Sequence, residues 1–302
     1  PKAENLIDIK NRFLIEKEDV ISIVEKDNIL RHKYDSFCSL VVGSKKYCGA
    51  GVLAMLATLK AGGTYVQTLV PKNISDIYRN ANPESRIVEI GKRDYFYSNN
   101  FKKVVDNISY KKGPVLIGPG LGEDESTQSF VVKILKYLKA EKYNCVLDAS
   151  GFQPLYSNQI TIDDLPEDCI LTPHRGEFDK IFPQYCGSNR SQIDICEEVS
   201  NKLNGRVLIL KGPTTIIVSR DKNIYILNNS NSLLSCAGSG DVLAGILTGL
   251  LAYGYDIDKA SIIGVYVHSL CSDIFYSEKS KYKMCSKDIL DIIPRAFNEV
   301  VL

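Results

Sequence analysis

The sequence predicts an α/β protein built on a largely parallel sheet that helices cover on both faces. Short runs of β-branched and aliphatic residues alternate with helical stretches along almost the whole chain. These apolar runs are nearly continuous, which is typical of strands buried on both faces. Residues suited to ligands follow four of the strands, at the edge where parallel sheets bind their ligands.

The expected elements follow one another in a regular order. An apolar stripe indicates a helix over 49–62, and an amphipathic helix over 127–141 has Ser126 placed to cap it. No linker, repeat or low-complexity segment divides the sequence, so we expect a single domain over 1–302. We expect strands at 39–43, 65–69, 115–118, 145–148, 169–172 and 207–210, a late hairpin over 215–227, and helices over 242–253 and 259–276.

The composition argues against several classes of function. Lys and Arg number 37 against 36 Asp and Glu, and this net charge of +1 gives no support for nucleic-acid binding. No apolar run reaches the length of a membrane span, and the start lacks a signal-peptide pattern, so we expect a cytoplasmic protein without membrane association. The nine cysteines lack metal-binding spacing, which favours free thiols, with Cys38, Cys145 and Cys169 in the core. Pro1 indicates either a removed Met or a missing upstream segment.

The most informative segment runs from Ala237 through Gly238, Ser239 and Gly240 to Asp241, where an apolar run begins. A helix that starts here presents unpaired N–H donors and a partial positive charge, which suit a phosphate. We expect a carboxylate in that first turn to stay ionised beside the anion. The segment therefore indicates phosphoryl transfer with Asp241 as the base, and the alternative is an ordinary N-cap turn.

Further candidate residues follow other expected strands. The glycines of 118–122 allow close approach of the backbone to a ligand, or a plain tight turn. His174 and Glu177 bring an imidazole and a carboxylate to a helix start, or form a simple helix start with a surface histidine. In the segment 211–215, Lys211 is placed to reach a phosphate. Alternatively, this segment is a turn between a strand and a hairpin, and Lys211 extends into solvent. Asp148 suits a sugar hydroxyl, a water or Mg²⁺, or caps the next helix.

Taken in order, these loops resemble the ADP/ATP-dependent NAD(P)H-hydrate dehydratases, a ribokinase-like family. No Walker A loop, dinucleotide-binding fingerprint or nucleophile elbow occurs in the sequence. The resemblance implies a three-layer α/β/α ribokinase-like fold and a repair reaction. NADH or NADPH hydrated at C6 of the nicotinamide ring is phosphorylated on the added hydroxyl, and the phosphate is then eliminated. The matching segments are 47–62, 118–122, 171–178, 210–215 and 238–245.

The resemblance also implies a role for each matching residue. Asp241 deprotonates the hydroxyl, while Gly238, Ser239 and Gly240 stabilise the transferring phosphoryl group. We expect Mg²⁺, ADP or ATP as the phosphoryl donor, a homo-oligomer, and a functionally linked epimerase of the same hydrated substrates. The metal ligands stay unknown. Contacts to the hydrated dinucleotide fall on Ala50, Gly120, Gly122, His174 and Asp241, and contacts to the nucleotide donor fall on Lys211, Gly212, Pro213, Thr214, Thr215 and Gly240.

The sequence departs from the family pattern at a few places. Cys236 and Ala237 replace a Thr-Gly pair, Ser150 stands where many members carry an Asp, and the first loop over 43–47 is one residue shorter. The Thr-Pro-His segment with His174 is more similar to the ADP-using prokaryotic members than to the ATP-using eukaryotic ones, so the resemblance favours ADP as the donor. Two alternatives stay open. One is a kinase of the same fold that acts on a vitamin precursor or a sugar hydroxyl, and the other is a non-catalytic dinucleotide-binding protein.

Overall fold

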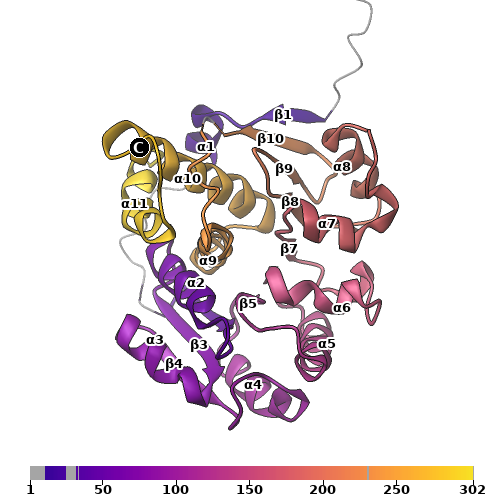
Figure 1. Cartoon of the computed structure of the whole chain (residues 1–302), viewed down its shortest axis with the longest axis vertical. Helices are drawn as coiled ribbons and strands as arrows, with labels where there is room; N and C mark the ends of the chain where they lie inside the picture. Colours follow the sequence, from indigo (N-terminus) through magenta and orange to yellow (C-terminus); the bar gives the residue numbers. More distant parts are fainter. Residues whose placement is uncertain (1–10, 25–31, 33, 230, 302) are drawn as a thin grey trace, which may run out of the picture.

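A computed structural model describes residues 11–24, 32, 34–229 and 231–301, and these form one mixed sheet with helices on both sides (Figure 1). The strand order is β1-β10-β9-β8-β7-β6-β5-β2-β3-β4. All pairings from β4 across to β8 are parallel, whereas β9 is antiparallel to both β8 and β10. The mostly parallel sheet and the late hairpin are therefore confirmed. The strands are β1 (Arg12–Leu14), β2 (Phe37–Val41), β3 (Tyr65–Pro71), β4 (Arg86–Ile90), β5 (Val115–Ile117), β6 (Cys145–Leu147), β7 (Cys169–Leu171), β8 (Val207–Leu210), β9 (Thr214–Val218) and β10 (Ile224–Asn228).

Helices occupy most of the connections between parallel strands. Short 3₁₀ turns η1 (Lys72–Ile74), η2 (Ser98–Asn100), η3 (Ala149–Phe152), η4 (Ile162–Asp164) and η5 (Pro183–Tyr185) accompany them. The α-helices are α1 (Lys17–Ile23), α2 (Cys48–Lys60), α3 (Ser75–Ala81), α4 (Phe101–Ile108), α5 (Glu125–Ala140), α6 (Gln153–Tyr156), α7 (Arg175–Ile181), α8 (Gln192–Ser200), α9 (Ser239–Tyr253), α10 (Ile257–Glu278) and α11 (Ser286–Asn298).

Two helix starts differ from the sequence prediction. The expectation that Ser126 caps α5 was wrong, because Asp124 has the extended backbone of an N-cap and its carbonyl accepts from the Thr127 and Gln128 N–H groups. Helix α9 begins at Ser239, three residues before the expected start at 242. Gly238 precedes it in a left-handed conformation with φ of +86°, which a glycine adopts without steric strain.

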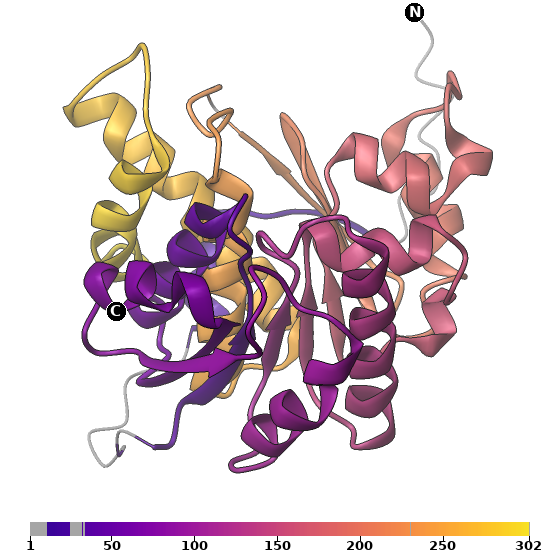
Figure 2. The ribbon, with the colours of Figure 1, turned by 60° about the horizontal axis from the view of Figure 1, so that its bottom comes forward.

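The sheet carries a separate apolar layer on each face, which makes three layers (Figure 2). Strand β5 shows the alternation, since Leu116 joins one layer while Val115 and Ile117 join the other. Helices α2, α9, α10 and α11 pack on the Leu116 face, and α4 to α8 pack on the opposite face. The three-layer α/β/α architecture is thus confirmed. All nine cysteines are free thiols, and no helix in the described part of the chain could span a membrane.

Helices α2 and α9 lie side by side with unusually close backbones (Figure 1). A Cβ added at Gly245 would lie 2.3 Å from the Ala54 carbonyl oxygen, and one at Gly249 would lie 2.8 Å from the Thr58 carbonyl oxygen. Glycines on α9 therefore permit the contact. This packing fixes the first turn of α9 against α2 at the edge of the sheet where the carboxyl ends of the strands lie.

Candidate active site

A cavity of about 600 Å³ lies beyond the carboxyl ends of β6 and β8, beside the first turn of α9. Parallel α/β sheets bind their ligands at this edge. The cavity brings together most of the segments that sequence analysis selected. Among its lining residues are Asp148, His174, Glu177, Lys211, Gly212, Pro213, Thr215, Asn229, Cys236, Gly238, Ser239, Gly240, Asp241, Val265 and His268.

The first turn of α9 leaves two backbone donors without a partner in the described chain. The Ser239 N–H donates to the Cys236 carbonyl at 3.2 Å, and the Val242 N–H donates to the Gly238 carbonyl at 3.0 Å. Between them, the N–H groups of Gly240 and Asp241 have no protein acceptor among the described residues. Both residues line the cavity, so this turn offers donors to an anionic ligand.

The pKa of Asp241 is raised, although a position at a helix start favours the ionised carboxylate. Burial, together with the nearby charges of Asp148 and Glu177, outweighs the opposing effect of Lys211 and raises the pKa of Asp241 to about 7. The expectation that this group is simply ionised was therefore wrong near neutral pH. A carboxylate with a pKa near the working pH is well matched to general base catalysis.

A partly buried ion pair lies near Asp241. Asp148 is only 2% exposed, and its Oδ1 accepts from Lys211 Nζ at 2.9 Å and from Thr172 Oγ1 at 2.7 Å. Burial opposes the charge on Lys211, but the carboxylates of Asp148, Glu177 and Asp241 outweigh it and raise the pKa of Lys211. A Cβ added at Gly240 would lie 3.0 Å from Lys211 Nζ, so the ammonium stands against the start of α9.

The loop after β7 fixes His174 at the rim of the cavity. His174 is the N-cap of α7, and its Nδ1 accepts from the Glu177 N–H at 3.2 Å, while Glu177 Oε2 accepts from the His174 N–H at 2.9 Å. This reciprocal pair is a capping box. The Lys211 N–H donates to the Pro173 carbonyl at 2.9 Å, which ties the loop to the end of β8.

The glycine loop after β5 does not line this cavity. A Cβ added at Gly118 would lie 1.7 Å from the Asp148 carbonyl oxygen, and one at Gly120 would lie 2.2 Å from the Tyr47 carbonyl oxygen. These glycines permit close packing between loops. A Cβ added at Gly120 would also lie 3.3 Å from Ala50 Cβ. Gly122 borders a separate cavity of about 420 Å³ together with Ser44, Lys45, Lys46, Tyr47, Asp94, Tyr95, Glu123 and Asp124.

Several lining residues were missed by sequence analysis. Thr214, which was selected, lies outside the cavity and contacts Asn228, whereas Asn229 lies inside it. His268, which was missed, comes from the middle of α10, whereas Cys236, named only as a departure from the family pattern, comes from the loop before α9. One sequence signal was present, a histidine within a largely apolar helical stretch, but spacing alone gives no reason to place it at the site.

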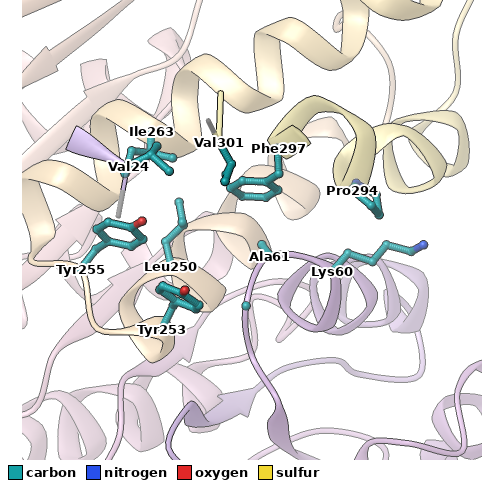
Figure 3. Close-up of a pocket in the computed structure, with 11 residues that line it drawn as sticks. Val24, Lys60, Ala61, Leu250, Tyr253, Tyr255, Ile263, Pro294, Phe297 and Val301 are labelled. Atoms are coloured by element: carbon teal, nitrogen blue, oxygen red, sulfur yellow. The ribbon is translucent and has the colours of Figure 1, made fainter. Parts of the chain in front are cut away.

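A third, apolar cavity of about 190 Å³ lies at the opposite end of α9 (Figure 3). The rings of Tyr253, Tyr255 and Phe297 surround Leu250, and the side chain of Lys60 extends away from them. Its lining includes no carboxylate, imidazole or thiol, so it lacks groups for acid–base chemistry near neutral pH. The polar cavity is therefore the candidate active site.

No group of three or more His, Cys, Asp or Glu side chains that could hold a metal occurs in the described parts of the chain. The polar cavity does contain two carboxylates besides Asp241, those of Asp148 and Glu177. Mg²⁺ commonly binds through one or two carboxylates together with substrate phosphates. The side chains present therefore fit an ion that binds together with a nucleotide.

A three-layer α/β/α fold, with a helix start suited to anions at the carboxyl edge of its sheet, matches the ribokinase-like class of α/β proteins. A ribokinase-like superfamily protein from Enterococcus faecalis V583 has the same fold, with a TM-score of 0.83, 19% identity and 97% coverage of each chain. A family model described as NAD(P)H-hydrate dehydratase matches residues 38–295. The chain therefore belongs to the NAD(P)H-hydrate dehydratase family.

Relatives within this family agree with that assignment. A bifunctional NAD(P)H-hydrate repair enzyme from Dictyoglomus turgidum is 32% identical over 267 residues, which cover 87% of this chain and 50% of the relative. The chain thus spans about half the length of the bifunctional relatives it matches. An ADP-dependent (S)-NAD(P)H-hydrate dehydratase from Bacillus subtilis is 26% identical over 260 residues, which cover 85% of this chain and 87% of the relative. The structure of a B. subtilis ADP/ATP-dependent dehydratase co-crystallised with ATP and Mg²⁺ aligns with a TM-score of 0.79 at 25% identity, covering 96% of this chain and 99% of that one.

Proposed function

We propose that the chain catalyses the nucleotide-dependent dehydration of hydrated NADH and NADPH. The observation that carries this proposal is Asp241, a carboxylate with a pKa of about 7 beside unpartnered N–H donors and the Lys211 ammonium. A base, a set of anion donors and a cation within one cavity match the needs of phosphoryl transfer to a hydroxyl. Membership of the family supplies the substrate.

The proposed reaction has two steps. Asp241 removes the proton from the C6 hydroxyl, whose oxygen attacks the terminal phosphoryl group of the donor nucleotide and displaces a nucleotide with one phosphate fewer. The C6–O bond then breaks as electrons move in from the ring nitrogen, and loss of a proton from C5 restores the dihydronicotinamide. The N–H groups of Gly240 and Asp241, together with Ser239, stabilise the charge that develops on the transferring group.

The nucleotide donor is proposed to lie along Lys211 to Thr215 and Gly240, with His174 between donor and substrate at the rim. Mg²⁺ would be held by the nucleotide phosphates and Glu177, and when bound it offsets phosphate charge. Glu177 fits this role because its second oxygen is not used by the capping box. We propose ADP as the preferred donor, and the naming of the B. subtilis relatives as ADP- or ADP/ATP-dependent supports either nucleotide.

The rest of the dinucleotide is proposed to extend past the start of α2. Ala50 and Gly120 meet there, and the cavity of about 420 Å³ beyond them offers the exposed ring of Tyr47 to a base. We further propose a homo-oligomer that works with an epimerase of the hydrated substrates. The double length and bifunctional names of the D. turgidum-type relatives support the link to a second activity.

An assay with hydrated NADH, Mg²⁺ and either ADP or ATP tests the proposal. We expect recovery of reduced-nicotinamide absorbance with one phosphate released for each dinucleotide restored. Accumulation of a phosphorylated dinucleotide without recovery would indicate a kinase instead. Binding of the dinucleotide by folded protein without any turnover, with either donor, would indicate a non-catalytic binder and overturn the proposal.

A further inference from the structure

His268 is a buried imidazole at the active site to which the proposed reaction gives no role. It lies in α10, is 7% exposed, and lines the polar cavity. Its Nε2 lies 3.1 Å from the hydroxyl oxygen of Ser239, the first residue of α9. Burial lowers the pKa of His268 to about 4 and outweighs a hydrogen bond to the Ser239 backbone, which raises this pKa, while nearby Lys211 lowers it as well.

The tautomer of a neutral imidazole decides what the Ser239 hydroxyl can do. If Nε2 carries the hydrogen, it donates to Ser239 Oγ, and the hydroxyl hydrogen is left free to donate into the cavity. If Nδ1 carries it, the hydroxyl donates to Nε2 and presents only lone pairs to a ligand. A phosphoryl group that gains negative charge needs a donor at this position, as the N–H groups of Gly240 and Asp241 provide next to it.

We infer that His268 is a positioning residue whose Nε2–H donates to Ser239 and directs the serine hydroxyl hydrogen toward the transferring phosphoryl group. The inference rests on the proposed function, because it assigns the donor set of that same site. Two residues 29 positions apart in sequence, one on α9 and one on α10, thereby act together on the phosphoryl group.

The neighbouring residue Ser269 provides a matched control. It is 6% exposed, and its hydroxyl donates to Asn229 Oδ1 at 2.9 Å, while Asn229 Nδ2 donates to the Gly212 carbonyl at 3.0 Å. Consecutive residues of α10 therefore support different parts of the site. His268 contacts the start of α9, whereas Ser269 acts through Asn229 on the loop proposed to hold the nucleotide.

The kinetic test compares His268→Leu, His268→Gln, Ser269→Ala, Ser239→Ala and the double variant Ser239→Ala/His268→Leu. We expect His268→Leu to lower kcat about 10- to 100-fold, with KM for the nucleotide within about 3-fold. His268→Gln, whose amide N–H reaches the position of Nε2, should recover most of the rate. Ser269→Ala should act chiefly on KM for the nucleotide. In the double variant the loss should equal that of Ser239→Ala alone, because His268 acts through that hydroxyl.

Multiplied losses in the double variant, or a glutamine variant as slow as the leucine variant, would overturn the inference. If His268→Leu does not fold, His268→Asn serves in its place, since its shorter amide cannot reach Ser239. Failure of the wild-type protein in the same assay counts against the proposed function instead. Histidine-ring ¹⁵N NMR gives a readout independent of turnover, with only three histidines in the chain to assign. His268 should carry its hydrogen on Nε2, and a hydrogen on Nδ1 would contradict the inference.

Discussion

Helix α9 is flanked by left-handed glycines, Gly238 before it and Gly254 after it. The two ends differ in whether the terminal backbone groups find hydrogen-bond partners within the chain. At the C-terminal end the Gly254 N–H donates to the Leu250 and Leu251 carbonyls, and the Tyr255 N–H also donates to Leu250. These bonds satisfy the end of the helix from within the chain. At the N-terminal end two N–H groups have no acceptor in the described chain, and a carboxylate with a raised pKa stands beside them.

The cavities at the two ends of α9 also differ in the chemistry of their linings. Apolar rings and aliphatic side chains line the cavity at the C-terminal end, while charged and amide side chains line the one at the N-terminal end. One helix, packed closely on α2, thus has one end closed by its own chain and one end that we propose binds the ligand. Substitutions at the two ends should separate stability from catalysis.

The largest expected effect is that of Asp241→Asn. The amide keeps the size of the side chain but cannot accept the hydroxyl proton, so we expect kcat to fall about 10²- to 10⁴-fold. Binding of ADP, measured by calorimetry, should change little because the backbone donors remain. A near-wild-type rate would remove Asp241 from the role of base.

Next in size is the contrast between Gly238→Ala and Gly254→Ala. Both positions have positive φ, +86° and +116°, so each alanine should lower the free energy of unfolding by about 1–2 kcal/mol in denaturant titrations. A Cβ at Gly238 would also lie 2.3 Å from Leu53 Cδ1 and displace the first turn of α9, so we expect kcat to fall at least about 10-fold. Gly254→Ala should keep the wild-type kcat. Equal kcat values in the two variants would contradict the division of α9 into two functional ends.

Sequence periodicity was sufficient to predict the buried strands and the long helices, because a short continuous apolar run such as 207–210 is typical of a strand buried on both faces of a sheet. It was also sufficient to place Lys211 at the ligand-binding edge of a parallel sheet. The pairing of Lys211 with Asp148 was not predictable, since these residues are 63 positions apart and each had several local interpretations. His268 was missed for the same reason, because only the packing of α10 against α9 brings its ring to Ser239.

The pKa of Asp241 could not be predicted either. A helix start favours the ionised carboxylate, but desolvation and the two neighbouring carboxylates depend on tertiary structure. The glycine loop over 118–122 was interpreted as a site for a ligand or a tight turn. In the structure Gly118 and Gly120 also permit backbone contacts with the loops at Asp148 and Tyr47, which sequence spacing does not reveal.

The raised pKa of Asp241 makes a smaller prediction about stability. The folded state holds the proton up to about pH 7, whereas the unfolded chain releases it near the usual value of 3.8. The contribution of the Asp241 carboxyl to the free energy of unfolding is therefore fully present below about pH 3.8, and it is lost as the pH rises through about 7. Asp241→Asn should therefore be more stable than wild type above pH 7, by roughly 1–3 kcal/mol after allowance for partial exposure, with the difference shrinking toward pH 4. Asp106→Asn, on the exposed side of α4, serves as the matched control for the loss of one carboxylate.

The smallest expected effect is a displacement of the pH–rate profile. In wild type the acid limb of kcat/KM should fall near pH 7, where Asp241 gains its proton. Asp148→Asn removes a negative neighbour that raises this pKa, so the limb should move to lower pH. Lys211→Met removes the cation that lowers it, so the limb should move to higher pH, whatever the absolute loss of rate. Shifts in the same direction for both variants would show that the limb belongs to another group. Shifts in opposite directions would show that the ion pair at the ends of β6 and β8 sets the pKa of Asp241 at the N-terminal end of α9. Substitutions of Leu250 or Tyr253, at the other end of α9, should leave the acid limb in place.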